Sequence, residues 1–221
     1  MIDLHTHTTF SDGLLIPAEL ARRAKVTGYQ ALAFTDHADS STLFPILENL
    51  QQLVAQYSAH MGIDLFLGVE LTHNPPALIP MLTQRARANG AQLVLVHGET
   101  IVEPVERGTN LAAIRARVDI LAHPGLLTDE EAALAAELGV YLEITTRKGH
   151  SITNGHVAAM ARKHGAKLVI NNDAHGPGDL ISKELRRKVA LGAGLDENEY
   201  LQAEENSRGI LHSILQNLQK C

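Results

Sequence analysis

Short apolar segments alternate with helix-like segments along almost the whole chain of 221 residues. This alternation predicts a parallel sheet, because parallel strands of one sheet are joined by crossovers that usually contain a helix. Seven such units favour closure into an α/β barrel with outer helices, and an open doubly wound sheet is the alternative. The expected strands are residues 2–4, 31–35, 65–70, 92–96, 119–122, 140–144 and 167–170.

Proline, glycine and capping residues mark the helices between these strands. Pro17 suits the first turn of a helix and Gly28 its end, and Thr128 with Glu131 forms a capping box. Apolar residues at helical spacing over 43–57 predict an amphipathic helix whose leucine face packs in the core. Further helices are expected before residue 89, after 110, and over 154–164 and 182–190, followed by a short one capped by Asp196-x-x-Glu199 and a final one over 207–219. No linker interrupts the pattern, so residues 1–221 are expected to form one domain.

The charge balance limits the partners of the chain. A formal net charge of −6 argues against extended nucleic acid, which requires a basic surface. A small anionic substrate stays compatible, because bound metal ions would reverse the local field. Cys221 is the only cysteine, which excludes a disulfide framework and a cysteine-based zinc site. Asp3 and His5 interrupt the N-terminus and no long apolar run follows, so we expect a cytoplasmic protein without a membrane partner.

Histidines and carboxylates gather at one kind of boundary. Of twelve histidines, six lie at or just after the end of an expected strand: His5, His7, His37, His97, His123 and His175. Asp12, Glu70 and Asp173 occupy equivalent positions. Because the carboxyl ends of parallel barrel strands share one rim, these distant residues are expected to meet there.

The spacing of these residues indicates a metal site. His5 and His7 are two residues apart, so both imidazoles leave an extended segment on the same side. Asp173 and His175 repeat that spacing. Asp36 and His37 are adjacent and should point to opposite sides, so at most one of them binds an ion. Neutral imidazole is a good ligand for zinc, iron and manganese.

Taken together, the motifs resemble the polymerase-and-histidinol-phosphatase (PHP) family from residue 3 to about residue 176. They are His5-x-His7, Ser11-Asp12-Gly13, Thr35-Asp36-His37, Gly68-Val-Glu70, His97, Ala122-His123-Pro124 and Asp173-Ala-His175. The resemblance implies a distorted (β/α)7 barrel that holds two or three divalent metal ions (zinc, manganese or iron) and hydrolyses phosphate esters.

The resemblance also implies a ligand set for each ion. One ion would be held by His5, His7, Glu70 and Asp173. A second would be held by Glu70, as a bridge, with His97 and His123. A third would be held by Asp12, His37 and His175. Some family members have histidine where this chain has Asp12. The carboxylate is a harder ligand, in the sense of hard and soft metal ligands, than imidazole.

We therefore expect a metal-dependent phosphatase. Two ions about 3.5–4 Å apart lower the pKa of a shared water, so a bridging hydroxide is expected to attack phosphorus in a small-molecule phosphate monoester. Histidinol phosphate is the first substrate that the family suggests. Arg147 is the expected catalytic phosphate contact, and Arg147, Lys148 and His73 are the expected substrate-binding residues. Glu143 is expected to orient a ligating histidine, with an ion pair to Arg147 as the alternative, and the loop over residues 98–110 is expected to cover the site.

Three other functions compete with this hypothesis. A nucleotide phosphodiesterase or exonuclease is disfavoured by the acidic charge and by an aromatic content of only 4% without tryptophan. An amidohydrolase barrel usually has a lysine where this chain has His97. A non-catalytic metal-binding module would show lost ligands, and all nine are present. The sequence leaves the oligomeric state open.

Overall fold

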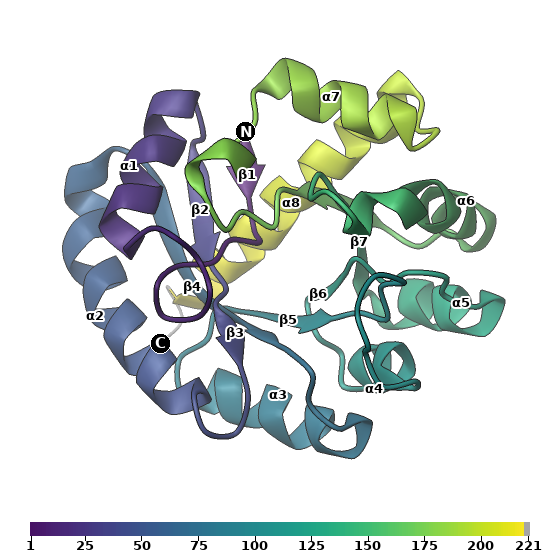
Figure 1. Cartoon of the computed structure of the whole chain (residues 1–221), viewed down its shortest axis with the longest axis horizontal. Coiled ribbons are helices and arrows are strands. Elements are labelled where there is room, and N and C mark those ends of the chain that lie inside the picture. The colour runs from purple at the N-terminus through teal and green to yellow at the C-terminus, as the bar shows by residue number, and fades with distance from the viewer. Residues whose placement is uncertain (219–221) are drawn as a thin grey trace.

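Seven parallel strands form a nearly closed barrel with helices around it in the computed structural model, which describes residues 1–218 (Figure 1). Their order is β1 (Ile2–Asp3), β2 (Ala31–Phe34), β4 (Asp64–Leu71), β5 (Leu93–His97), β6 (Ile120–Ala122), β7 (Tyr141–Thr145) and β8 (Leu168–Asn171). This arrangement confirms the expected distorted (β/α)7 barrel. Cys221, and the expected last helical residue Gln219, lie outside the described residues.

A further strand, β3 (His37–Ala38), was not predicted. It pairs with β4 in parallel, so that His37 lies opposite Glu70. Two residues are too few for a strand period to show in a sequence. The pairing nevertheless decides where the His37 imidazole lies relative to the Glu70 carboxylate.

The barrel closes between β1 and β8 through a short and irregular seam. Beyond the ends of both strands, Thr6 and Ala174 form an isolated parallel bridge, and the His7 amide donates to the Ala174 carbonyl at 2.9 Å. Before the bridge, the Leu4 amide donates to the Asn171 side chain at 3.0 Å, where a regular strand would offer a carbonyl. The seam therefore brings the segments that follow β1 and β8 side by side.

The helices begin and end close to the predicted positions. They are α1 (Pro17–Thr27), α2 (Leu43–Met61), α3 (Ile79–Ala88), α4 (Thr109–Arg115), α5 (Asp129–Leu138), α6 (Asn154–His164), α7 (Lys183–Gly192) and α8 (Glu197–Leu218), with single 3-10 turns at Pro76–Leu78, His150–Thr153 and Pro177–Asp179. Gly28 ends α1 with a φ of 99°, and Thr128 and Glu131 form the expected capping box of α5.

The C-terminal region corrects one expectation. The short helix expected to begin at Asp196-x-x-Glu199 and the final helix expected from Ser207 are, within the described residues, a single helix, α8. Its buried positions recur three or four residues apart from Tyr200 to Ile214, and they include Glu204 and Ser207. Polar residues on a buried face hide the apolar period from which a helix is predicted.

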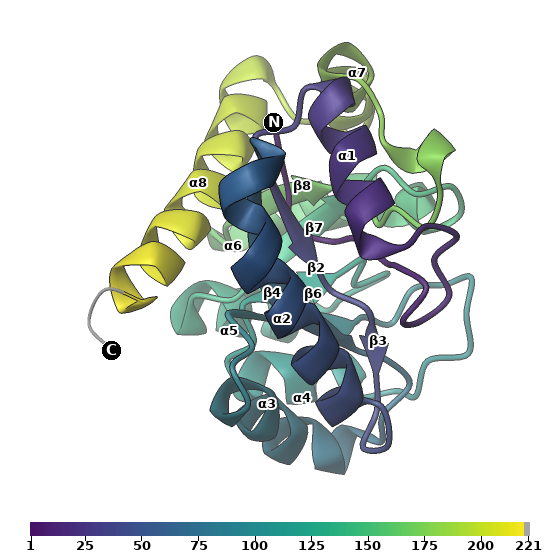
Figure 2. The same cartoon turned by 90° about the vertical axis from the view of Figure 1, so that its left-hand side faces the viewer.

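Two apolar layers hold the barrel together. The larger lies between the strands and the surrounding helices. The smaller fills the barrel interior, where Ile210, Leu211 and Ile214 of α8 pack with Ile2 and Phe66. Helix α8 thus lies across one end of the barrel, on the side opposite to β3 (Figure 2). Among residues 1–218, no helix is both long and apolar enough to cross a membrane.

Candidate metal centre

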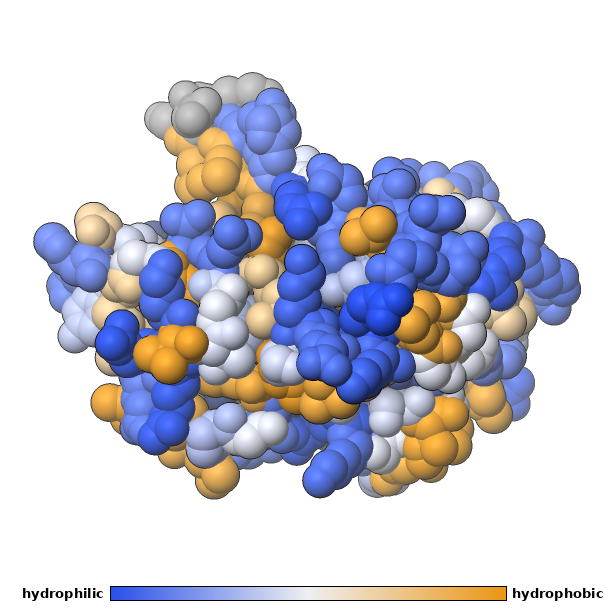
Figure 3. All heavy atoms as spheres, turned by 90° about the horizontal axis from the view of Figure 1, so that it is seen from above, coloured by the Kyte–Doolittle hydropathy of each residue, from blue (hydrophilic) through white to orange (hydrophobic). Residues whose placement is uncertain are grey.

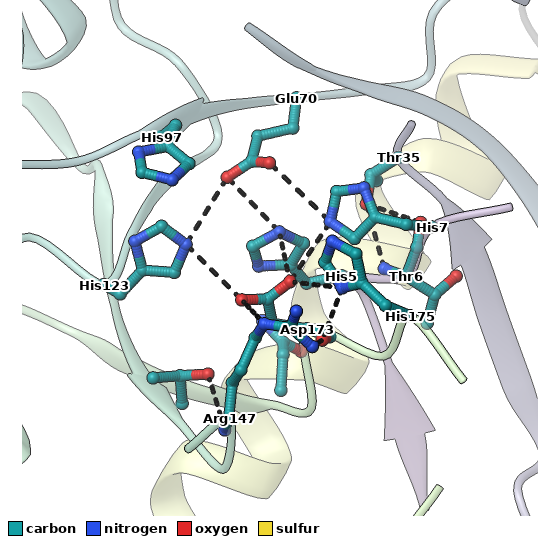
Figure 4. A network of polar contacts seen from close by, with 12 residues as sticks. His5, Thr6, His7, Thr35, Glu70, His97, His123, Arg147, Asp173 and His175 are labelled. Carbon is teal, nitrogen blue, oxygen red and sulfur yellow. Dashed lines mark hydrogen bonds and ion pairs between the residues drawn. The ribbon is translucent and has the colours of Figure 1, made fainter. Parts of the chain in front are cut away.

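All nine predicted ligands lie at or just beyond the carboxyl ends of the strands, in neighbouring groups of candidate ligands, and Figure 4 shows seven of them: His5, His7, Glu70, His97, His123, Asp173 and His175. His5 and His7 follow β1, Asp12 lies in the next loop, His37 is in β3, Glu70 in β4, His97 ends β5, His123 follows β6, and Asp173 and His175 follow β8. His5, His7 and Glu70 are fully buried, whereas the Asp12 side chain is 59% exposed. The centre thus extends from the barrel interior to the solvent.

Glu70 and Asp173 form the middle of the cluster, facing each other across the histidines (Figure 4). His5 Nε2 lies 3.3 Å from Glu70 Oε1, and His7 Nε2 lies 3.2 Å from Asp173 Oδ1. His123 Nε2 lies 3.6 Å from an oxygen of each carboxylate. Ligands bound about 2.1 Å from one zinc ion in a tetrahedron are roughly 3.4 Å apart, so the spacing fits a shared cation.

The donors suggested for a third ion also meet. Asp12 Oδ1 lies 3.2 Å from His175 Nε2 and 3.5 Å from His37 Nε2. The His7 ring stacks on His175 with centroids 4.1 Å apart, and these four side chains form one group of candidate ligands. The His37 Nδ1 atom contacts Glu70 Oε2 at 2.7 Å, which connects this group to the middle of the cluster.

The set suggested for the second ion is brought together only in part. His123 approaches Glu70, but His97 Nε2 faces Glu103 Oε2 at 3.0 Å. His97 and His123 instead share a candidate ligand group with His150, whose ring stacks on His123 with centroids 4.2 Å apart. The role of these residues as ligands stays a prediction.

Unpaired polar atoms show that the cluster fits divalent cations. Within residues 1–218, Nε2 of His5 and His7, Oε1 of Glu70 and Oδ1 of Asp173 are buried and have no hydrogen-bond partner. A buried polar atom without a partner costs about 1–3 kcal/mol. A cation bound among these atoms would remove that cost, and nitrogen and oxygen donors suit zinc, manganese or iron.

The charge states of the cluster follow from burial and from neighbouring charges. Burial raises the pKa of Asp173 to about 7. Burial, and then the neighbouring His37, hold the pKa of His7 well below the usual range. Burial, and then the neighbouring His97, do the same for the pKa of His123. These two imidazoles are therefore neutral at pH 7, as a metal ligand must be.

Glu143 holds the inner histidines in place. Its Oε1 lies 2.9 Å from His5 Nδ1, and its Oε2 accepts from the His123 amide at 3.1 Å. Asn171 donates to Oε1 at 2.8 Å. Glu143 is thus a partner of His5, as expected, and its contact directs His5 Nε2 toward Glu70.

Asp36 points away from the cluster and organises the first loop. It accepts from the Thr8 amide and from the Ser11 hydroxyl, each at 2.7 Å. This confirms that Asp36 and His37 face opposite sides. The turn is tight, since a Cβ on Gly13 would lie 2.4 Å from the His7 carbonyl oxygen.

Of the four non-glycine residues with positive φ within residues 1–218, three lie at the same rim, and the fourth, Arg117, lies before β6. His73, His123 and Asp173 have φ values of 52°, 26° and 53°, a region that non-glycine residues rarely adopt. Such conformations cost about 1–3 kcal/mol each and persist where surrounding contacts enforce them. Surrounding contacts therefore hold the backbone of the rim in a strained conformation, and this conformation sets the directions of these side chains.

A cavity of about 200 Å³ opens above the cluster and is lined by Arg147, His73 and the outer ligands, among others. Arg147 Nε lies 3.5 Å from Asp173 Oδ2, and its Nη1 lies 3.6 Å from Asp179 Oδ2. Of the three predicted substrate contacts, Arg147 and His73 thus line the cavity. Lys148 is exposed and does not.

Glu103 and Thr72 line the cavity without having been predicted. Glu103 lies in the 98–110 loop that was expected to cover the site. Loop length and polarity were the available signal, but no periodicity tells which loop residue points inward.

Comparison with known proteins supports the sequence motifs. Residues 3–100 match the family model described as the PHP domain. A Methanocaldococcus jannaschii protein named as uncharacterized is 51% identical over 199 residues, covering 89% of this chain and 91% of that protein. Ribonuclease P protein component 3 of Methanosarcina mazei is 30% identical, covering 87% and 80%. A probable phosphatase of Shewanella is 28% identical, covering 79% and 76%.

The chain therefore belongs to the PHP family. It is a hydrolytic enzyme of the phosphoesterase type, and the family implies divalent metal ions. The fold, the rim position of the clustered donors and the similarity to known proteins agree on this class.

Proposed function

We propose that the chain hydrolyses the phosphate monoester of a small molecule and holds two or three divalent ions (zinc, manganese or iron) at the nine clustered residues. The observation that carries this proposal is the cavity of about 200 Å³, which is lined by Arg147 together with candidate metal ligands such as Asp173 and His175. A volume below that of most drug-sized pockets suits a phosphoryl group with a compact leaving group. The similarity to a probable phosphatase supports the same reaction.

Divalent ions at this site would supply charge neutralisation and an activated water. His5, His7, Glu70 and Asp173 would hold one ion, and Asp12, His37 and His175 another. His97 and His123, with Glu70, would hold the remaining one. The protein itself supplies a buried and rigid donor set, since Glu143 fixes His5 and the seam between β1 and β8 fixes Asp173.

Arg147 acts on the substrate in this proposal. Its guanidinium lies at the cavity beside Asp173 and Asp179, with 29% of the side chain exposed. From there it can donate two parallel hydrogen bonds to phosphoryl oxygens. The charge that develops on the transferring group is stabilised by such donors.

Cleavage of a nucleotide phosphodiester is the second candidate. It is favoured by the similarity to ribonuclease P protein component 3, a name that describes that relative as a component of a ribonuclease. The formal charge of −6 disfavours extended nucleic acid as the substrate, so a short nucleotide would be the substrate under this alternative.

Hydrolysis of an aryl phosphate and of an aryl phosphodiester by the full chain, before and after chelation, tests the proposal. We expect faster monoester hydrolysis that chelation abolishes and added metal restores. Arg147→Gln should lower kcat about 100-fold, because a donor to the developing charge is lost. Lys148→Gln is the matched control and should change kcat less than about threefold. Activity that survives chelation, or a preference for the diester, would contradict the proposal. Screening phosphorylated metabolites, histidinol phosphate first, would then identify the substrate.

A further inference from the structure

Glu103 brings a carboxylate to three histidines at the mouth of the cavity. Its Oε2 lies 3.0 Å from His97 Nε2 and 3.5 Å from His73 Nε2, and its Oε1 lies 3.4 Å from His150 Nε2. His73, His97 and Glu103 form a group of candidate ligands whose donor atoms all lie within 4.8 Å of one another. Of these four residues, only His97 belongs to the nine predicted ligands.

The loop between β5 and α4 is fastened so that Glu103 reaches this position. Glu99 accepts from the amides of Gly108 and Asn110 at 2.9 and 3.0 Å, and the Asn110 side chain accepts from the Glu99 amide at 2.9 Å. The Asn110 amide group also donates to the Pro124 carbonyl at 2.9 Å. Both ends of the loop are therefore tied to each other and to the segment after β6.

Two of the histidines are held by contacts of their own. The Thr100 hydroxyl lies 2.8 Å from His150 Nδ1, which leaves His150 Nε2 facing Glu103. His73 has a φ of 52°, and the neighbouring Asn74 side chain holds this turn through the carbonyls of Ala38 and Thr72. The strained backbone at His73 turns its imidazole toward the same carboxylate.

We propose that His73, His97 and Glu103 form an outer cation subsite, which binds zinc or a similar divalent ion. Two imidazoles and one carboxylate are a donor set that zinc accepts. The side chains of His73 and Glu103 are 46% and 37% exposed, so water can complete the coordination. His150 faces the other oxygen of Glu103 and orients it. The inference goes beyond the proposed function, and because a neutral imidazole binds only one ion, an ion bound here takes His97 from the set that it would form with Glu70 and His123.

Anomalous diffraction at the zinc edge, on crystals of the full chain with zinc, tests the subsite directly. We expect a peak within about 2.3 Å of His73 Nε2, His97 Nε2 and a Glu103 oxygen. The absence of such a peak, with Glu103 still beside His97, would overturn the proposal. Peaks among His5, His7 and Glu70 report separately on the proposed function, whose failure would leave the outer peak unaffected.

Metal binding by variants gives a second test that does not depend on activity. In equilibrium dialysis with zinc, Glu103→Gln and His73→Gln should each weaken one bound equivalent at least about 10-fold and leave the others unchanged. Glu106→Gln, an exposed residue of the same loop, is the matched control and should bind as the wild type does. Equal number and affinity of bound ions in Glu103→Gln and Glu106→Gln would overturn the proposal, because Glu103 would then serve only as an ion-pair partner.

Discussion

The two ends of the barrel are built from opposite kinds of side chain. At the end covered by α8, Ile210, Leu211 and Ile214 pack on the apolar residues that begin the strands. At the other end, where the strands finish, several buried imidazole and carboxylate atoms, such as His5 Nε2 and Glu70 Oε1, have no hydrogen-bond partner within residues 1–218. Figure 3 shows the end of α8 projecting from the body, with apolar residues on its side. Leu215 of this helix is 46% exposed.

The end covered by α8 is therefore expected to contribute mainly to stability, and the rim mainly to activity. Apolar burial at the α8 end stabilises the chain by about 25 cal/mol for each Å² removed from water. The rim instead keeps unpaired buried polar atoms and left-handed backbone at His123 and Asp173, both of which cost free energy. Substitutions at the two ends should therefore act on different measured quantities.

The largest effect is expected for Asp173→Asn. Loss of a central ligand should lower kcat/KM more than about 100-fold, since even partners that only orient ligands contribute 10–100-fold. In the metal-free protein, by contrast, the same substitution should increase the free energy of unfolding. The raised pKa of about 7 means that the folded state disfavours the ionised carboxyl, so wild-type stability falls as the pH rises from about 4 to 7.

Asparagine carries no charge and tolerates the φ of 53° at this position. Above pH 7, metal-free Asp173→Asn should therefore be more stable than the wild type, on the order of 1–3 kcal/mol. Chemical denaturation of both proteins with chelator, at pH 5 and pH 8, measures this difference. Lower stability of the variant at pH 8 would mean that the rim is not under electrostatic strain.

Leu211→Ala addresses the opposite end. Leu211 is 7% exposed and belongs to the interior cluster, so its truncation should cost about 2–3 kcal/mol of unfolding free energy. The kcat/KM value should change less than about twofold. Leu215→Ala is the matched control on the same helix, because Leu215 is 46% exposed and should cost less than about 0.5 kcal/mol. A large loss of activity in Leu211→Ala would show that the two ends are coupled.

Glu143→Gln tests whether metal binding at the rim depends on the hydrogen bonds that orient its histidines. Glutamine has one acceptor oxygen, whereas Glu143 accepts at both oxygens from His5, His123 and Asn171. The orientation of His5 should loosen, and metal affinity should fall about 10-fold, equivalent to about 1.4 kcal/mol. Glu137→Gln, on the exposed face of α5, is the control. Unchanged metal affinity in Glu143→Gln would mean that His5 is oriented by packing alone.

Sequence patterns predicted the rim better than the α8 end. Parallel strands bring their carboxyl ends to one rim, so histidines and carboxylates that follow separate strands had to meet. Each of the seven strands had its own apolar run, and the expected alternation of strand and helix was confirmed. The spacing of His5 and His7 predicted side chains on one side, and both face the cluster.

What could not be predicted depends on contacts between distant segments. Glu103 reaches His97 only because Glu99 and Asn110 fasten the loop that carries it. The continuity of α8 was hidden in the sequence because Glu204 lies on its buried face, where its carboxylate is paired at 2.7 Å with the fully buried Arg186 of α7. No local sequence pattern predicts such a buried ion pair.

The outer surface, away from both ends, offers the smallest expected effect. Arg162 of α6 contacts both oxygens of Glu199 at 2.7 Å and so connects α6 to α8. This hydrogen bond, and then the Asp196 amide, lower the pKa of Glu199 from 4.5 to about 2. A lowered pKa means that the pair stabilises the fold above pH 4.5 and that this stabilisation is lost as the pH falls toward 2.

Both side chains are partly exposed, so solvent screening limits the contribution to about 0.5–1 kcal/mol. Glu199→Gln should therefore lower the unfolding free energy by that amount at pH 7, and the difference from the wild type should disappear near pH 2. Glu205→Gln removes an i,i+3 pair with Arg208 on the same helix and should cost only a few tenths of a kcal/mol. Denaturant titrations across this pH range measure the difference. If the effect of Glu199→Gln persisted unchanged at pH 2, the stabilisation would come from hydrogen bonding rather than from charge. This surface contact would then be independent of pH, as the apolar packing of α8 at the end of the barrel is.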